Sequence, residues 1–86
     1  MRAGERVRWY IMGMGTEFDL HTPHWHGNTL LENGNTMGMR TDVTQVFPAT
    51  MKVLDMKPDN VGTWLYHCHV GDHITAGMLA LYKVEP

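Results

Sequence analysis

Two short segments of the chain hold all six histidines and the single cysteine. Residues 21–26 read His-Thr-Pro-His-Trp-His, and residues 67–73 read His-Cys-His-Val-Gly-Asp-His, with a methionine five residues further on. A thiolate, two imidazoles and a weak axial thioether make the ligand set of a blue copper electron-transfer site. That set can be supplied here by His21, Cys68, His73 and Met78.

The direction of side chains along an extended chain sorts these ligands into two groups. Successive side chains of a strand point to opposite faces, so Cys68 is opposed to both His67 and His69. His24 and His26 are two residues apart and share a face. The first group is His21, Cys68, His73 and Met78. The second group is His24, His26, His67 and His69.

These residues could also have no metal-binding role, because histidines are common at surfaces and a lone cysteine is usually a small buried hydrophobe. The placement of all six histidines around one cysteine favours metal binding instead. A structural zinc site is closed and tetrahedral, and it would not need this many nitrogen and sulfur ligands in two divergent groups. The sequence therefore predicts copper rather than zinc.

The two segments resemble the copper-binding signatures of the multicopper oxidase family, in particular its last cupredoxin domain. The resemblance extends from about Gly4 to Val84. Residues 9–15, 19–22 and 58–65 are most similar to the ferroxidase branch that includes ceruloplasmin and hephaestin. It implies an all-β, cupredoxin-like Greek-key sandwich and an enzyme of the oxidoreductase class.

The resemblance also implies a role for each ligand. The type 1 copper would be bound by His21, Cys68 and His73, with Met78 axial. The type 2 copper would be bound by His24, and the type 3 pair by His26, His67 and His69. The family oxidises a reducing substrate at type 1 copper, moves the electrons through the cysteine and its flanking histidines, and reduces dioxygen to water at the trinuclear cluster. This gives Cys68, His67 and His69 catalytic roles.

The expected identity of the reductant depends on the role of Asp72, which precedes the type 1 ligand His73. By resemblance to the ferroxidase branch, it occupies the place of a carboxylate that helps to hold Fe(II), and a hard oxygen ligand suits iron. The alternative is that Asp72 caps the following turn or orients an imidazole. Fe(II) is thus the favoured small reductant, and laccase-type oxidation of phenols or amines is the alternative.

Other functions fit less of the sequence. A type 1 electron carrier without oxidase activity leaves the second group of histidines unexplained. A module with vestigial metal sites, as in non-catalytic relatives among coagulation factors, is disfavoured because all the ligands are present. A nitrite-reducing copper protein fits less well than a type 3 pair beside Cys68.

The family's trinuclear cluster takes eight histidines from two domains, and this chain can give four. We expect another cupredoxin domain, or a second copy of the chain, to complete the cluster, and the isolated 86-residue chain to be inactive. The resembled domains carry further strands before Gly4, so we expect residues 1–86 to be a single plastocyanin-like domain that lacks its first strands.

Composition excludes several classes of partner. The net charge of −2 and the lack of a basic stripe disfavour nucleic acid. No apolar run reaches the roughly 20 residues of a membrane span, and the N-terminus has no secretory signal. A single cysteine excludes an internal disulfide. An extracellular or periplasmic location is expected by family analogy alone.

Short strands separated by turns must position the ligands. The alternation in residues 7–12 predicts a strand. Further strands are predicted near residues 18–21, 24–31, 41–47, 51–56, 63–69 and 78–84, with a helical turn within 69–76. Turns are predicted at Asn33-Gly34 and at residues 58–60.

The remaining methionines and tryptophans have mainly structural interpretations. Met12, Met14, Met51 and Met56 are interpreted as core-filling residues and strand side chains. Residues 37–39, Met-Gly-Met, are interpreted as a hairpin extension, with a Cu(I) docking loop as the alternative. The three tryptophans should pack the sandwich, and Trp25 can instead wall the type 1 side.

Overall fold

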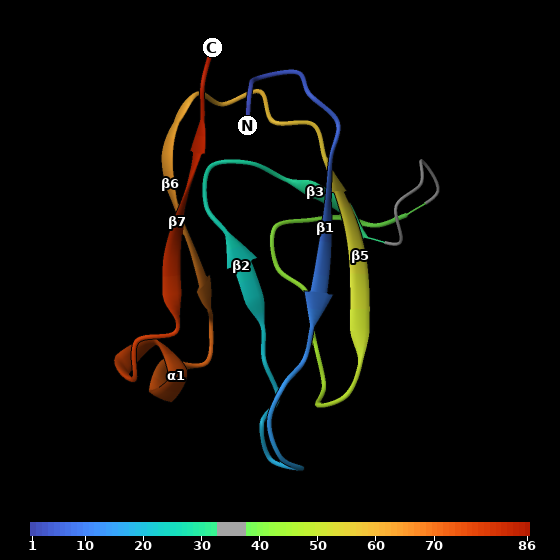
Figure 1. The fold of residues 1–86 in the computed structure, drawn as a ribbon, viewed down its shortest axis with the longest axis vertical. Coiled ribbons are helices and arrows are strands. Elements are labelled where there is room, and N and C mark those ends of the chain that lie inside the picture. The colour runs from blue at the N-terminus through green and yellow to red at the C-terminus, as the bar shows by residue number, and fades with distance from the viewer. Residues whose placement is uncertain (33–37) are drawn as a thin grey trace.

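The computed structural model describes residues 1–32 and 38–86 of the chain as strands and one short helix (Figure 1). The predicted turn at Asn33-Gly34 and the methionine at position 37 lie outside the described residues. The elements are β1 (Val7–Met12), β2 (Pro23–Trp25), β3 (Leu30–Glu32), β4 (Arg40–Thr41), β5 (Met51–Met56), β6 (Gly62–Cys68), α1 (Gly71–Thr75) and β7 (Leu79–Val84).

Two antiparallel sheets make up the fold. One has the strand order β1-β5-β3-β4 and the other has the order β2-β6-β7. Both termini lie at the end of the molecule opposite α1 (Figure 1). There Ala3 N–H donates to the Glu85 carbonyl and Glu85 N–H donates to the Met1 carbonyl, so the beginning and the end of the chain pair with each other. The predicted all-β class is confirmed.

An aromatic and aliphatic core joins the two sheets. Its buried members are Trp25, Leu30, Leu54, Met56, Tyr82 and Val84. The rings of Trp9 and Trp25 meet edge to face with centroids 5.6 Å apart, and the Trp25 ring lies 5.0 Å from that of Tyr66. Edge-to-face and offset contacts at such separations stabilise a core beyond the area they bury. Trp25 is fully buried in this core and is not a lining residue of the cavity beside Cys68.

Several predicted strands match the structure. β1, β5, β6 and β7 occur where the sequence predicts strands, and α1 falls within the predicted helical turn. In β1, alternate residues beginning at Val7 face the core and those beginning at Arg8 face outward, as a half-buried strand requires. The strand period is therefore a reliable guide in this part of the chain.

The single strand predicted over residues 24–31 is wrong, because the chain changes sheets within it. β2 belongs to one sheet and β3 to the other. Between them Gly27 has a φ of +79°, which a strand does not allow. A Cβ at Gly27 would collide with the ring of Trp64, so packing from a distant strand requires this turn.

In place of two other predicted strands, the structure has mainly isolated β-bridges. Residues 18–21 form no strand, and only His21 makes a bridge there, to Val46. In residues 41–47 the chain forms the end of β4 and then single bridges from Val43 and Val46. These segments are extended, but each is held at single points rather than along a ladder.

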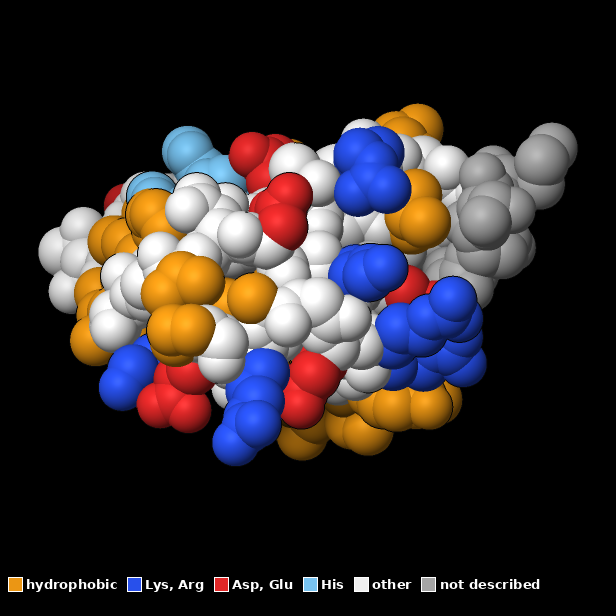
Figure 2. Space-filling model, turned by 90° about the horizontal axis from the view of Figure 1, so that it is seen from above, with side chains coloured by type: hydrophobic (Ala, Val, Ile, Leu, Met, Phe, Trp, Pro, Cys, Tyr) orange, Lys and Arg blue, Asp and Glu red, His pale blue; other side chains and the backbone are white. Residues whose placement is uncertain are grey.

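Met56 is buried in the core, and Met12 and Met51 are strand side chains of β1 and β5, as predicted, whereas Met14 lies outside the strands. Met12, Met14 and Met51 are exposed, each by 60% or more. Figure 2 shows other apolar side chains at the surface between charged ones. Flexible thioethers tolerate both environments, so their presence in or beside strands did not identify a core position. No helix among the described residues has the length and hydropathy that a membrane crossing requires.

Truncating Leu54 tests the position of the core. Leu54 is fully buried within it, so Leu54→Ala should lower the free energy of unfolding by about 2–5 kcal/mol. The matched control is Leu81→Ala on β7, because Leu81 is 68% exposed and its loss should change that free energy by less than about 0.5 kcal/mol. Urea denaturation measures both. Equal effects would contradict the assignment of Leu54 to the core.

Candidate metal centre

Pairing between β2 and β6 brings the two histidine segments together. In this antiparallel register Pro23 lies opposite Cys68, and His24 lies opposite His67. Residues directly opposite each other on such strands have adjacent side chains. His21 is fixed just before β2 by two backbone hydrogen bonds with Val46. Segments far apart in the sequence therefore meet at one end of the smaller sheet.

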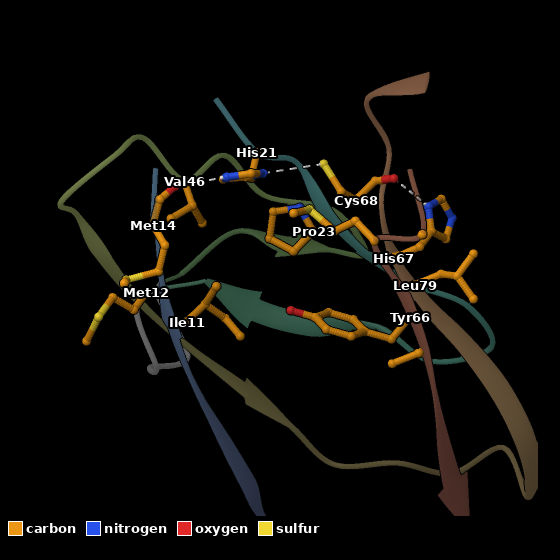
Figure 3. A pocket seen from close by; sticks show the side chains of 13 residues that line it. Ile11, Met12, Met14, His21, Pro23, Val46, Tyr66, His67, Cys68 and Leu79 are labelled. Atoms are coloured by element: carbon orange, nitrogen blue, oxygen red, sulfur yellow. Dashed lines mark hydrogen bonds between the residues drawn. The ribbon is translucent and has the colours of Figure 1, made fainter. Parts of the chain in front are cut away.

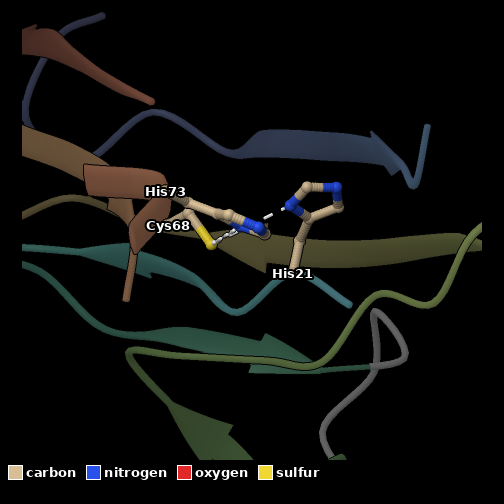
Figure 4. A group of neighbouring side chains, drawn as sticks. All are labelled: His21, Cys68 and His73. Carbon is tan, nitrogen blue, oxygen red and sulfur yellow. Dashed lines mark hydrogen bonds between the residues drawn. The ribbon is translucent and has the colours of Figure 1, made fainter. Parts of the chain in front are cut away.

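Cys68 and two imidazoles form the first group, which we call the thiolate site (Figure 4). The Sγ of Cys68 lies 3.4 Å from Nδ1 of His73 and 3.9 Å from Nδ1 of His21. Cys68 is 4% exposed, and the backbone N–H of Thr22 donates to its sulfur at 3.4 Å. One metal ion can be reached by all three ligand atoms, which lie within 4.8 Å of one another.

The orientation of His21 is set by a backbone carbonyl. Its Nε2 lies 3.1 Å from the carbonyl oxygen of Met14. A carbonyl only accepts, so Nε2 carries the proton and donates, which leaves the lone pair of Nδ1 facing Cys68. Met14 thus selects the tautomer that a metal ligand needs at this position.

The surroundings of Cys68 favour its thiolate. Burial raises the pKa of the thiol, but the N–H groups of Thr22 and Val70 and the imidazoles of His21 and His73 lower it further, to about 6. In its protonated form the His21 imidazole donates a hydrogen bond to the Cys68 sulfur, which in turn raises the pKa of His21. A thiolate at neutral pH is the form that binds metal ions.

The second group, the histidine cluster, consists of His24, His26 and His67, whose ligand atoms also lie within 4.8 Å of one another. The Nε2 atoms of His26 and His67 are 3.0 Å apart. The ring of His69 lies 5.5 Å from that of His24 and 5.4 Å from that of His67. His69 is exposed at the margin of the cluster. The structure therefore gathers all four histidines that the strand period placed in the second group.

Backbone carbonyls orient two rings of the histidine cluster. The Nδ1–H of His24 donates to the Asp42 carbonyl, and the Nδ1–H of His67 donates to the Cys68 carbonyl, both at 2.8 Å. Each ring then presents Nε2 as its free ligand atom. Burial, reinforced by the neighbouring His24 and His67, lowers the pKa of His26, so its imidazole is neutral at pH 7. Neutral imidazoles are the form that coordinates metals.

An open apolar cavity of about 420 Å³ adjoins the thiolate site (Figure 3). Cys68, His21 and Met78 line it together with apolar side chains of β1 and β7. The Met78 carbonyl accepts the N–H of Cys68, and the Met78 N–H donates to the His73 carbonyl. Met78 is therefore tied by its backbone to two members of the thiolate site.

Asp72 is exposed in the first turn of α1, one residue before His73. The N-cap of this helix is Val70, and no side chain caps it, so the structure does not give Asp72 the capping role that was the alternative. Its carboxylate is available to solvent beside the thiolate site.

Sequence reasoning missed the groups that orient the ligands. The carbonyls of Met14, Asp42 and Cys68 carry no sequence signal, because every residue has one. Asn28 and Tyr82 were missed too, because the burial that obliges the Asn28 amide to find partners cannot be known from the sequence.

The whole chain, residues 1–86, matches the multicopper oxidase family. The chain belongs to the multicopper oxidase family. Ceruloplasmin of Rattus norvegicus is 48% identical over 86 residues, which cover 100% of this chain and 8% of that protein. Hephaestin of Homo sapiens is 49% identical over 84 residues, which cover 98% of this chain and 7% of that protein. The chain therefore spans less than a tenth of the length of these relatives.

Solved structures agree on the fold. A multicopper oxidase from Campylobacter jejuni, described as a metallo-oxidase, has a TM-score of 0.80 and 27% identity over 100% of this chain and 20% of that one. A multi-copper oxidase from Pediococcus acidilactici has a TM-score of 0.86 at 22% identity, again over 100% and 20%. The predicted cupredoxin-like sandwich is thus confirmed.

Copper is the metal of this family, and the donor sets fit it. The thiolate site offers a soft sulfur and two Nδ1 atoms, and the histidine cluster offers imidazole nitrogens. Soft thiolate and imidazole are ligands that copper accepts readily. Two separate sets, each within reach of an ion, favour copper over a single closed zinc site.

The Cys68 thiol should titrate at about pH 6 in the metal-free protein, because the N–H donors and imidazoles around it favour the thiolate. Ultraviolet absorbance of the thiolate measures this against denatured protein, where about 8.5 is expected. The folded pKa is the lower one, so the stability from the thiolate is complete above about pH 8.5 and lost as the pH falls through 6. This loss should be missing in Cys68→Ser. A folded-state value near 8.5 would contradict the geometry.

Proposed function

We propose that this chain is the copper-binding C-terminal domain of a multicopper oxidase, in which the thiolate site takes electrons from a reductant and the histidine cluster forms half of a dioxygen-reducing centre. The observation that carries the proposal is that the ligands form two separate sets, one containing Cys68 and the other containing its neighbour His67 on β6. A single electron-transfer copper would need only the first set.

In this proposal His21, Cys68 and His73 would hold type 1 copper, and Met78 would supply a fourth, weak thioether ligand. His24 serves type 2 copper, and His26, His67 and His69 serve the type 3 pair. Copper so bound supplies one-electron redox chemistry. Four electrons and four protons convert one dioxygen to two waters, so four oxidations of a one-electron reductant balance each turnover.

The chain itself links the two sites. Cys68 belongs to the thiolate site, while its neighbours His67 and His69 belong to the other group of ligands. The covalent path from the sulfur to either imidazole therefore runs through a few bonds of one strand. A second link is the hydrogen bond from Nδ1 of His67 to the carbonyl of Cys68 at 2.8 Å. Both links support Cys68 as the route for electrons.

Four histidines make half of the trinuclear cluster, so the proposal requires a partner. A second cupredoxin domain is favoured, and a second copy of this chain is the alternative. The histidine cluster supports this because it is open at one side: His69 is exposed, and a polar hollow lined by His24, His26 and Asp42 adjoins it. In this proposal the isolated chain does not turn over.

Fe(II) is the proposed reductant, with a phenol or amine as the second candidate. Asp72 favours iron, because its exposed carboxylate precedes His73 and a hard oxygen donor suits that ion. The similarity to ceruloplasmin and hephaestin supports the same choice. The apolar cavity beside His21 and Met78 is the observation that keeps an organic reductant as the second candidate. By analogy with the family, an extracellular or periplasmic setting is expected.

Copper loading tests the thiolate site. The purified protein should bind copper and develop an intense blue absorption band, whereas Cys68→Ser should lose the band, because serine cannot supply the thiolate. Absorption and electron paramagnetic resonance are recorded together with copper stoichiometry, and circular dichroism checks that the fold persists. Full activity of the complete oxidase carrying Cys68→Ser would rule out the route through this residue. Extra copper bound only by an oligomer would favour the second copy as partner.

Replacing Asp72 separates the two reductants. Made in the complete oxidase that carries this domain, Asp72→Ala should lower kcat/KM for Fe(II) by about tenfold or more, because an oxygen ligand is lost, and should change phenol oxidation little. Glu85→Ala is the control, since that exposed carboxylate follows β7 at the end opposite Met78. Steady-state oxidation of both substrates is compared. Equal losses for iron and phenol would count against the iron role.

A further inference from the structure

The three rings of the histidine cluster are not held alike. His24 and His67 each donate a ring Nδ1–H to a backbone carbonyl. Within the described residues, the Nδ1 of His26 has no such partner, and its ring contacts the cluster through Nε2. The orientation of His26 must therefore come from the placement of its backbone.

Two hydrogen bonds to the backbone of His26 fix that placement. The N–H of His26 donates to the Leu65 carbonyl at 2.9 Å, which ties it to β6. The hydroxyl of Tyr82 donates to the His26 carbonyl, which ties it to β7. Tyr82 is 8% exposed, so water does not replace this bond easily.

A buried amide sets the direction of the Tyr82 hydroxyl. The Nδ2 of Asn28 donates to the Tyr82 oxygen at 3.2 Å, so the single hydroxyl proton is left for the His26 carbonyl. The Oδ1 of Asn28 accepts the N–H groups of Asp59 and Asn60 at 3.2 and 3.1 Å. Asn28 therefore has both ends of its amide engaged while only 6% exposed.

The turn between His26 and Asn28 is closed from outside as well. Gly27 is in the left-handed region at φ +79°, and its carbonyl accepts from Nδ2 of Asn60 at 3.0 Å. The Trp64 ring packs against Gly27, and its Nε1 donates to the Asn60 carbonyl. These contacts hold the turn after His26, and the hydroxyl of Tyr82 holds the carbonyl of His26 itself.

We propose that Tyr82 and Asn28 are positioning residues that aim the imidazole of His26 into the histidine cluster. The proposal rests on the proposed function insofar as copper occupies that cluster. It assigns the Tyr82 hydroxyl a role that the ring alone does not have, since phenylalanine would fill the same core space beside Trp9.

Tyr82→Phe is the first test in the purified protein. Cu(II) affinity of the histidine cluster, measured by competition with a chelator, should fall about 10–100-fold, as is typical when a residue that orients a ligand is lost. The blue band of the thiolate site should persist in the same sample and serves as an internal control for the fold. Equal weakening of both sites would mean a structural role only, and unchanged affinity would also overturn the proposal.

Asn28→Asp is a second variant of almost equal volume. A carboxylate cannot donate, so it should take the hydroxyl proton of Tyr82 and draw it away from the His26 carbonyl. The affinity of the histidine cluster should fall as in Tyr82→Phe. Tyr10→Phe is the matched control, because Tyr10 is 75% exposed on β1 and should have no effect. Full affinity in Asn28→Asp would remove Asn28 from the proposal.

A readout without metal separates this inference from the proposed function. In the metal-free protein the rings of His26 and His67 have centroids 5.1 Å apart, close enough for nuclear Overhauser contacts between ring protons. These contacts should weaken in Tyr82→Phe and persist in Tyr10→Phe. If the parent protein bound no copper at the histidine cluster, the proposed function would fail while this measurement still decided the positioning role. Unchanged contacts in Tyr82→Phe would overturn it.

Discussion

The alternation of side chains along β6 is the constraint on which both sites depend. A strand sends Cys68 to one face and His67 to the other, so a single backbone step separates a sulfur-containing site from a nitrogen-only site. A shift of one residue in the pairing with β2 would move each ligand to the wrong face. The pairing of His24 with His67 is therefore as important as the identity of either residue, because it gives each side of the strand its partners.

Backbone geometry does most of the preorganisation. Carbonyls of Met14, Asp42 and Cys68 choose which nitrogen of each ring is free, and the result differs between the sites: His21 offers Nδ1 whereas His24 and His67 offer Nε2. A carbonyl is a fixed acceptor that does not titrate, so it selects the same tautomer whenever the imidazole is neutral. Polar side chains, by contrast, act at a distance through the turn after His26.

Much of the fold and the grouping of ligands could be predicted because both follow from the strand period, as in β1 and in the step from His67 to Cys68. The predictions that were wrong concerned features set by contacts between residues distant in the sequence. The break between β2 and β3 at Gly27 depends on the ring of Trp64, which comes from a strand 37 residues further on. Met12 and Met51 pair across β1 and β5 with their side chains at the surface, which a thioether tolerates as readily as a core. Carbonyls that orient the rings are invisible in any sequence.

The two sites also differ in what they need from the rest of the molecule. The thiolate site draws its ligands from the segment before β2, the end of β6 and α1, and its thiolate is stabilised by donors that are all present in this chain. The histidine cluster is gathered by β2 and β6 but is open on one side, where His69 is exposed. In the proposed function, the thiolate site would hold its metal with ligands of this chain alone, whereas the open histidine cluster would take further ligands from a partner. Because Cys68 is bonded to His67 and His69 through the backbone, a partner that completed the cluster would be linked to the thiolate site by a short covalent path.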